Sequence, residues 1–206
     1  MTEVKLPFPQ ALWEDLSKAD PLRAAQNSGA TFENGRFEVS FLGAPFVVDL
    51  AERTVIGPPT RKRADFQRAL VLVVYLAHCG QNQTPEPAGR FVGPLEIPGG
   101  AMFFRGPHVI ATAPLEEAYG KNPEALAAKA FSLGAQKSPD YLFAWRVLPK
   151  IDLACVLYPE DEEFPAQASY LVDAHANFFM PLDALWGLIN VVTLELLPTN
   201  AEKTAP

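Results

Sequence analysis

Residues 156–179 read VLYPEDEEFPAQASYLVDAHANFF, and this stretch decides how the second half of the chain folds. The apolar and aromatic residues on both sides of an acidic run are typical of β-strands. The run itself, residues 160–163, holds four consecutive carboxylates and is followed at once by Phe164 and Pro165. Because burying several unpaired carboxylates is strongly unfavourable, the run is expected at a solvent-exposed tip. The stretch therefore predicts two strands joined as a hairpin.

Similar patterns predict further strands in both halves of the chain. In residues 36–57, RFEVSFLGAPFVVDLAERTVIG, apolar side chains alternate with polar ones up to Phe41, and the alternation resumes after a short turn. Residues 140–159, DYLFAWRVLPKIDLACVLYP, contain two strand-like runs on either side of Pro149. Because only short turns separate these runs, the strands are expected to pair as antiparallel hairpins.

One long apolar segment predicts a central helix. Residues 66–79, FQRALVLVVYLAHC, are apolar almost all the way round a helix between Ala69 and Ala77, which indicates a helix buried in the core. Gly80 suits the left-handed position that ends many helices. Shorter flanking helices are predicted for residues 10–27, with a break at Asp20 and Pro21, and for residues 114–120, 124–133 and 184–197.

This order of elements predicts an α+β fold rather than an alternation of strands and helices. A chain of 206 residues is long enough for one sizeable core. We therefore expect a single domain at residues 10–198, built from a mainly antiparallel sheet packed by the buried central helix and the flanking helices. Residues 199–206 are expected to form a frayed tail.

Composition and charge narrow the class of protein. The net charge of −7 and the absence of a basic stripe argue against nucleic acid or an anionic membrane as a partner. The longest apolar runs are shorter than the roughly 18 to 20 residues that span a bilayer. Cys79 and Cys155 have apolar neighbours and are expected to be buried, reduced thiols. With no secretory signal at the N-terminus, these features predict a cytoplasmic protein.

Four segments resemble the DUF3786 family, a bacterial and archaeal family of unknown function, and the resemblance covers roughly residues 11–197. The segments are FEVSFLGAPFVVDL, LEIPGGAMFF, YGKNPEALAAKAFSLGA and VLYPEDEEFPAQASYLVDAHANFFMPLDAL. Some members of this family are similar to iron-sulfur proteins or carry a cysteine-rich cluster segment. Because this chain has two cysteines, it cannot supply the four thiolates of a typical cluster, and no iron-sulfur cluster is expected from it alone. A redox role would come through a partner.

The acidic run is the first candidate site. Its spacing does not match an EF-hand loop, and no metal site is predicted. Because Phe164 and Pro165 follow the acids directly, one or two carboxylates are expected to turn inward. We predict that at least one of Asp161, Glu162 and Glu163 pairs with an arginine, either as a structural contact or as part of a ligand site. The available arginines are Arg105 and Arg146.

Further candidates are a glycine pair and a strand end. Gly99 and Gly100 either form a backbone nest that accepts an anion or make a turn between strands. Asp173 and His175 lie on one face of a predicted strand and would suit an orienting acid and a general base, although no nucleophile motif accompanies them. The three histidines show no ligand spacing in the sequence. A metal site assembled in space from His78, Cys79, Cys155 or His175 is a further alternative, because zinc and iron accept imidazole and thiolate together.

The leading functional hypothesis is a non-catalytic binding module. It would hold a small molecule, a metal cofactor or a partner protein beside enzymes of anaerobic redox or one-carbon metabolism, as the resemblance implies. The second hypothesis is an enzyme whose acidic turn converges on Asp173 and His175 as an acid–base or metal site. The third is a protein-interaction scaffold with an exposed apolar patch that includes Trp13 or Trp186.

Overall fold

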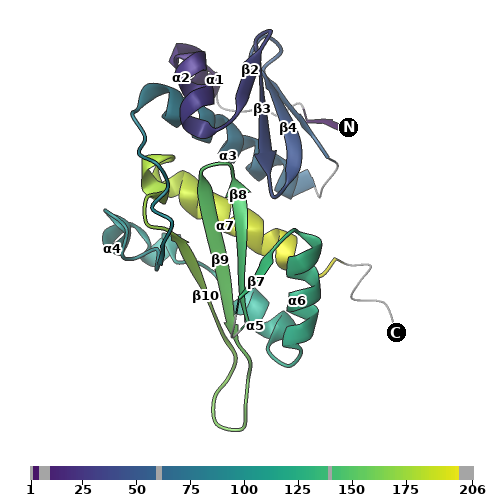
Figure 1. Ribbon diagram of the computed structural model, residues 1–206. Coiled ribbons are helices and arrows are strands. Elements are labelled where there is room, and N and C mark those ends of the chain that lie inside the picture. The colour runs from purple at the N-terminus through teal and green to yellow at the C-terminus, as the bar shows by residue number, and fades with distance from the viewer. Residues whose placement is uncertain (1, 5–9, 59–61, 139–140, 200–206) are drawn as a thin grey trace.

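The strands of the chain form two antiparallel sheets, which we call sheet A and sheet B (Figure 1). The computed structural model describes residues 2–4, 10–58, 62–138 and 141–199. Each sheet has five strands within this part of the chain. The tail predicted at residues 199–206 lies, apart from Thr199, outside the described residues.

Sheet A comes from the N-terminal part of the chain and has the strand order β1-β5-β4-β3-β2. Its strands are β1 (Thr2–Val4), β2 (Thr31–Glu33), β3 (Arg36–Phe41), β4 (Ala44–Asp49) and β5 (Thr54–Gly57). Asn34 and Gly35 join β2 to β3 with left-handed φ angles of 51° and 76°, which match the twist that a tight hairpin needs. Along β3 the burial alternates residue by residue, so the predicted period-two pattern is confirmed.

Sheet B has the strand order β6-β10-β9-β8-β7. Its strands are β6 (Phe91–Val92), β7 (Gln136–Ser138), β8 (Leu142–Leu148), β9 (Ile151–Tyr158) and β10 (Gln167–Asp173). β9 and β10 form the hairpin predicted for residues 156–179, and its tip projects away from the body of the protein (Figure 1). The hairpin of β8 and β9 turns at Pro149 and Lys150, also as predicted.

Helices cover both sheets. They are α1 (Gln10–Lys18), α2 (Pro21–Ser28), α3 (Lys62–Gln81), α4 (Gly100–Phe103), α5 (Ala113–Tyr119), α6 (Pro123–Ser132) and α7 (Leu182–Leu196), with short 3-10 turns η1 (Gly106–His108) and η2 (Ala176–Phe178). α3 runs behind sheet A, and α7 runs behind sheet B (Figure 1). Within the described residues, no helix combines the length and the apolar character that crossing a membrane requires.

The predicted central helix is α3. It packs against α1, α2 and α7, and its side chains from Arg68 to Cys79 are buried on nearly every side. The Arg68 side chain lies about 5 Å from the ring centres of Phe41 and Phe46, and its Nη2 is 2.7 Å from the Glu195 carboxylate on α7. The buried side chains of both sheets form one continuous core. The predicted α+β fold with a buried central helix is therefore confirmed.

The prediction that Gly80 ends α3 in a left-handed conformation is wrong. Gly80 lies inside the helix, which continues to Gln81. A glycine is needed there because the chain between α1 and α2 approaches α3 closely. A Cβ atom at Gly80 would lie 2.7 Å from the Cβ of Ala19 and 3.0 Å from that of Ala24. Gly80 is therefore a packing position between helices.

Substituting the two glycines inside long helices should have opposite effects on stability. Gly80→Ala should lower the free energy of unfolding by about 1–3 kcal/mol, because the added methyl group overpacks the contact with Ala19. At Gly187 in α7 the nearest atom to an added Cβ is 3.7 Å away, so Gly187→Ala should raise stability by up to about 1 kcal/mol through helix propensity. Urea unfolding measures both variants. A Gly80→Ala protein as stable as the parent would show that the helices can separate at this point without loss.

Candidate functional site

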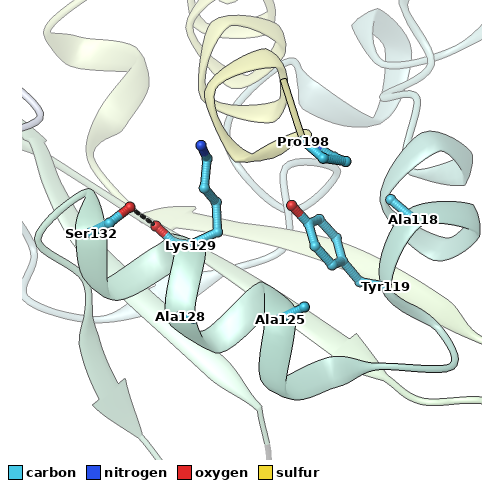
Figure 2. Close-up of a pocket in the computed structure, with 7 residues that line it drawn as sticks. All are labelled: Ala118, Tyr119, Ala125, Ala128, Lys129, Ser132 and Pro198. Carbon is cyan, nitrogen blue, oxygen red and sulfur yellow. Dashed lines mark hydrogen bonds between the residues drawn. The ribbon is translucent and has the colours of Figure 1, made fainter. Parts of the chain in front are cut away.

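A groove with a cavity volume of about 520 Å³ lies between α5, α6 and the end of α7 (Figure 2). Its lining is mainly apolar and comes from Ala118, Tyr119, Ala125, Ala128, Lys129, Ser132 and Pro198. The Lys129 side chain rises from α6 toward the end of α7, and the Tyr119 ring stands between α5 and α6. The groove thus combines small apolar side chains with a cationic group.

The local sequence explains the shape of this groove. Ala125, Ala128, Lys129 and Ser132 are spaced three, four and seven residues along α6, which places them on one face of the helix. Alanine side chains are small, so this face leaves room beside α5. α6 begins at a proline, and the preceding Asn122 side chain accepts a hydrogen bond from the amide of Ala125 at 3.3 Å.

The hydroxyl groups of the lining already have partners. The buried Tyr119 hydroxyl donates to the carbonyl of Leu196 at 2.5 Å, which fixes α5 to the end of α7. The Ser132 hydroxyl donates to the carbonyl of Lys129 at 2.7 Å. The described lining contains no histidine, cysteine or carboxylate that could act as a general base or a nucleophile. The arrangement suits binding of a ligand that has an apolar body and an anionic group.

The acidic run forms an exposed turn, and Asp161 builds it. One oxygen of its carboxylate accepts hydrogen bonds from the amides of Glu163 at 2.8 Å and Phe164 at 2.7 Å. These two bonds lower the pKa of Asp161. Glu162 and Glu163 point into solvent, and the Phe164 side chain is 62% exposed, so it does not draw the acids inward.

The predicted ion pair between this turn and an arginine is wrong. Arg146 lies on β8 directly opposite Asp152 of β9 and binds its two carboxylate oxygens at 2.8 and 2.9 Å. Hydrogen bonds to Asp152, together with the nearby charge of Asp173, raise the pKa of Arg146. Within the described residues, neither Arg146 nor Arg105 forms an ion pair with any of residues 161–163. The guanidinium finds its partner on the neighbouring strand, where the hairpin register places it.

Asp173 is buried at the end of β10 and holds a loop in place. Its carboxylate accepts hydrogen bonds from the amides of Ala88 at 2.9 Å, Gly89 at 2.8 Å and His175 at 2.8 Å. These bonds attach the chain before β6 to the end of sheet B. A carboxylate that already accepts three amide hydrogen bonds is suited to a structural role.

His175 is positioned by the same loop. Its Nδ1 lies 2.8 Å from the carbonyl oxygen of Glu86, and because a carbonyl can only accept, Nδ1 carries the proton. Glu86 in turn forms an ion pair with Lys150 at 2.7 Å. The structure therefore brings Arg146, Asp173 and His175 to one end of sheet B.

The acidic turn lies at the opposite end of that sheet. It precedes Gln167, the first residue of β10, whereas Asp173 is the last, so the length of the strand separates them by roughly 20 Å. The tip also points away from the body of the protein (Figure 1). The enzyme hypothesis requires the acidic turn to converge on Asp173 and His175. The structure places them at opposite ends of the sheet, so this convergence does not occur.

The glycine pair shapes the start of a short helix. Gly99 has a left-handed φ of 79° and precedes α4, while the amide of Gly100 donates to the carbonyl of Ile97 at 2.9 Å. A Cβ atom at Gly100 would lie 2.0 Å from the carbonyl oxygen of Pro94, so this position accepts no side chain. The turn leads into a helix and does not join two strands. Arg105 follows α4 and is exposed.

The thiol and imidazole groups do not assemble a metal site in the described part of the chain. Cys79 and Cys155 are free and buried, and burial raises the pKa of each thiol to about 12. Burial also lowers the pKa of His78. The His108 ring stacks on Phe103 with ring centres 4.3 Å apart.

Sequence reasoning missed the two groups that define the groove, Tyr119 and Lys129. Both belong to the segment YGKNPEALAAKAFSLGA, which resembles the DUF3786 family. The signal that could have located them is the recurrence of small residues and one lysine on a single face of the helix. The partner of that face is the end of α7, which is distant in sequence.

Comparisons with known proteins identify a family. The sequence profile described as "Domain of unknown function (DUF3786)" matches residues 20–194. Searches of curated proteins and of solved structures found no match.

Two carboxylates should differ in their effect on stability. Asp173→Ala should lower the free energy of unfolding by about 2–3 kcal/mol, because three backbone amides lose their acceptor. Glu162→Ala, at the exposed turn, should change it by less than about 0.5 kcal/mol. Urea unfolding of both variants distinguishes the roles. Equal losses would show that the acidic turn contributes to the fold as much as the buried carboxylate does.

Proposed function

The chain belongs to the DUF3786 family, and we propose that it is a non-catalytic binding module for a small molecule that has an apolar body and one anionic group. The observation that carries this proposal is the groove between α5, α6 and α7, in which Lys129 stands beside an otherwise mainly apolar lining. Its volume of about 520 Å³ is within the usual range for small-molecule pockets.

The surroundings of the potentially reactive side chains favour a binding role over a catalytic one. The thiols are buried with pKa values of about 12, so little thiolate forms near neutral pH. The carboxylate of Asp173 is held by backbone amides, and the acidic turn is at the far end of the hairpin. The described lining of the groove contributes alanine, proline, tyrosine, serine and lysine. These residue types bind and orient a ligand.

The cellular setting and the partners remain predictions. A cytoplasmic location and an accessory role beside anaerobic redox or one-carbon enzymes rest on the composition and on the resemblance given above. For an interaction scaffold, Trp13 is not available, because it is buried in the core. Large exposed apolar side chains occur instead at Leu95, Met102 and Val109.

The proposed ligand class can be tested with octanoate as an anionic probe and octanol as its uncharged counterpart, both measured by isothermal titration calorimetry. Octanoate should bind the parent protein more tightly than octanol, because Lys129 pairs with the carboxylate. Lys129→Gln should weaken octanoate binding about fivefold and leave octanol binding unchanged. Lys121→Gln is the matched control, because Lys121 is exposed and its ammonium lies 3.7 Å from Glu160 outside the groove.

A second variant locates the binding site. Ala128 is exposed on α6 and lines the groove, so Ala128→Trp should fill the groove without disturbing the core and abolish binding of both probes. Unchanged octanoate binding to Ala128→Trp would place the ligand elsewhere. If Lys129→Gln and Lys121→Gln weakened octanoate binding equally, the effect of charge would not depend on the groove, and the proposal would be contradicted.

A further inference from the structure

The edge of sheet B at β10 is covered by β6 over only a short length. β6 pairs with the end of β10 through two partners, Val92 opposite Val172 and Phe91 opposite Asp173. β10 itself begins five residues before Val172, at Gln167. Most of its outer edge therefore has no neighbouring strand among the described residues.

A proline ends this pairing. Because the partners in an antiparallel pair run in opposite directions, the next residue to exchange hydrogen bonds with β10, if β6 continued beyond Val92, would be Pro94, opposite Tyr170. Proline has no amide hydrogen, so the ladder cannot continue. The chain turns away at Gly93, whose amide donates to the Glu96 carboxylate at 2.7 Å.

The backbone groups of Tyr170 face the uncovered edge. The amide of Ala168, two residues earlier, donates to the Glu116 carboxylate at 2.8 Å and so points away from β9. The cross-strand neighbour of Ala168, Leu157, supports this direction, because the amide of Leu157 donates to the carbonyl of Tyr141 on the β8 side and so does not point toward β10. Hydrogen-bonding direction alternates along a strand, so the amide and carbonyl of Tyr170 also point away from β9. No described residue forms a hydrogen bond with either group.

A cavity of about 250 Å³ lies at this place. Tyr170, which is 3% exposed, lines it together with Pro94, Leu95, Val109 and Ile110. Leu95 and Val109 are each more than half exposed at its rim. The described lining carries no charged side chain, so an uncharged guest matches it. A buried, unpaired backbone amide and carbonyl beside an apolar cavity are what strand addition uses.

We propose that this edge binds a short extended segment of a partner protein, which adds a strand to β10. The segment would exchange hydrogen bonds with the backbone of Tyr170 and place one apolar side chain in the cavity. β6 closes the edge at Val172, and Glu116 closes it at Ala168. The open length is therefore about 13 Å, which admits three or four residues. This site is separate from the groove of α5 and α6 and does not depend on its function.

The probe is the uncharged peptide acetyl-Thr-Val-Val-Thr-amide, titrated against the full chain with detection by amide NMR. We expect the amide of Tyr170 to shift downfield on binding, while the amides of Ser169 and Leu171, which point toward β9, move little. Two further peptides carry an N-methyl group on the second or on the third residue. Because hydrogen-bonding direction alternates, one of the two methylated peptides should bind about tenfold more weakly and the other about as well as the parent peptide.

A matched pair of variants completes the test. Leu95→Glu should weaken peptide binding at least fivefold, whereas Leu22→Glu, on the exposed surface of α2, should leave it unchanged. Equal binding of the two methylated peptides would overturn strand addition and leave an apolar cavity that takes side chains alone. Absence of binding at millimolar peptide, or self-association of the protein in its place, would overturn the proposal as well.

Discussion

Burial of α3 on nearly all sides is the constraint on which the rest of the structure depends. A helix with apolar side chains in every direction needs cover in every direction, and neither sheet can supply it alone. α1, α2 and sheet A cover one part of its surface, and α7, which carries sheet B, covers another. Arg68 fits this interior because Glu195 neutralises it and the rings of Phe41 and Phe46 lie against its guanidinium. The two sheets thus belong to one core.

This arrangement leaves the two proposed binding surfaces at the margin of the protein. α3 packs mainly against α1, α2 and α7, so the face of α6 next to α5 can carry small side chains and a lysine without weakening the packing of the central helix. The uncovered edge of β10 is also peripheral, because it lies at the side of sheet B. The proline that stops β6 limits its length. The segments that we propose to bind and the segments that form the core are therefore largely different parts of the chain.

Local patterns predicted the elements, and non-local contacts determined what sequence reasoning missed. The hairpins around Pro149 and around the acidic turn follow from the alternation of apolar residues and from the turn residues. The burial of α3 follows from the apolar side chains around its whole circumference. The partner of Arg146 did not follow from the turn alone. A two-residue turn at Pro149 and Lys150 would place Val147 opposite Asp152, and a register shift between Arg146 and Leu148 places Arg146 there instead. The division of the strands into two sheets, the packing role of Gly80 and the groove each depend on segments distant in sequence. No local pattern encodes such contacts.

The overall charge limits what the groove can bind. The chain carries 24 acidic and 17 basic residues, so an anion approaching from solution meets a repulsive field before it reaches Lys129. A ligand with several negative charges feels this repulsion in proportion to its charge, while a single lysine offers one short-range pairing. A ligand with one negative charge and a large apolar part gains most from the mainly apolar lining and loses least to the field. The acidity of the chain and the lining of the groove therefore favour the same ligand class, a mainly apolar monoanion.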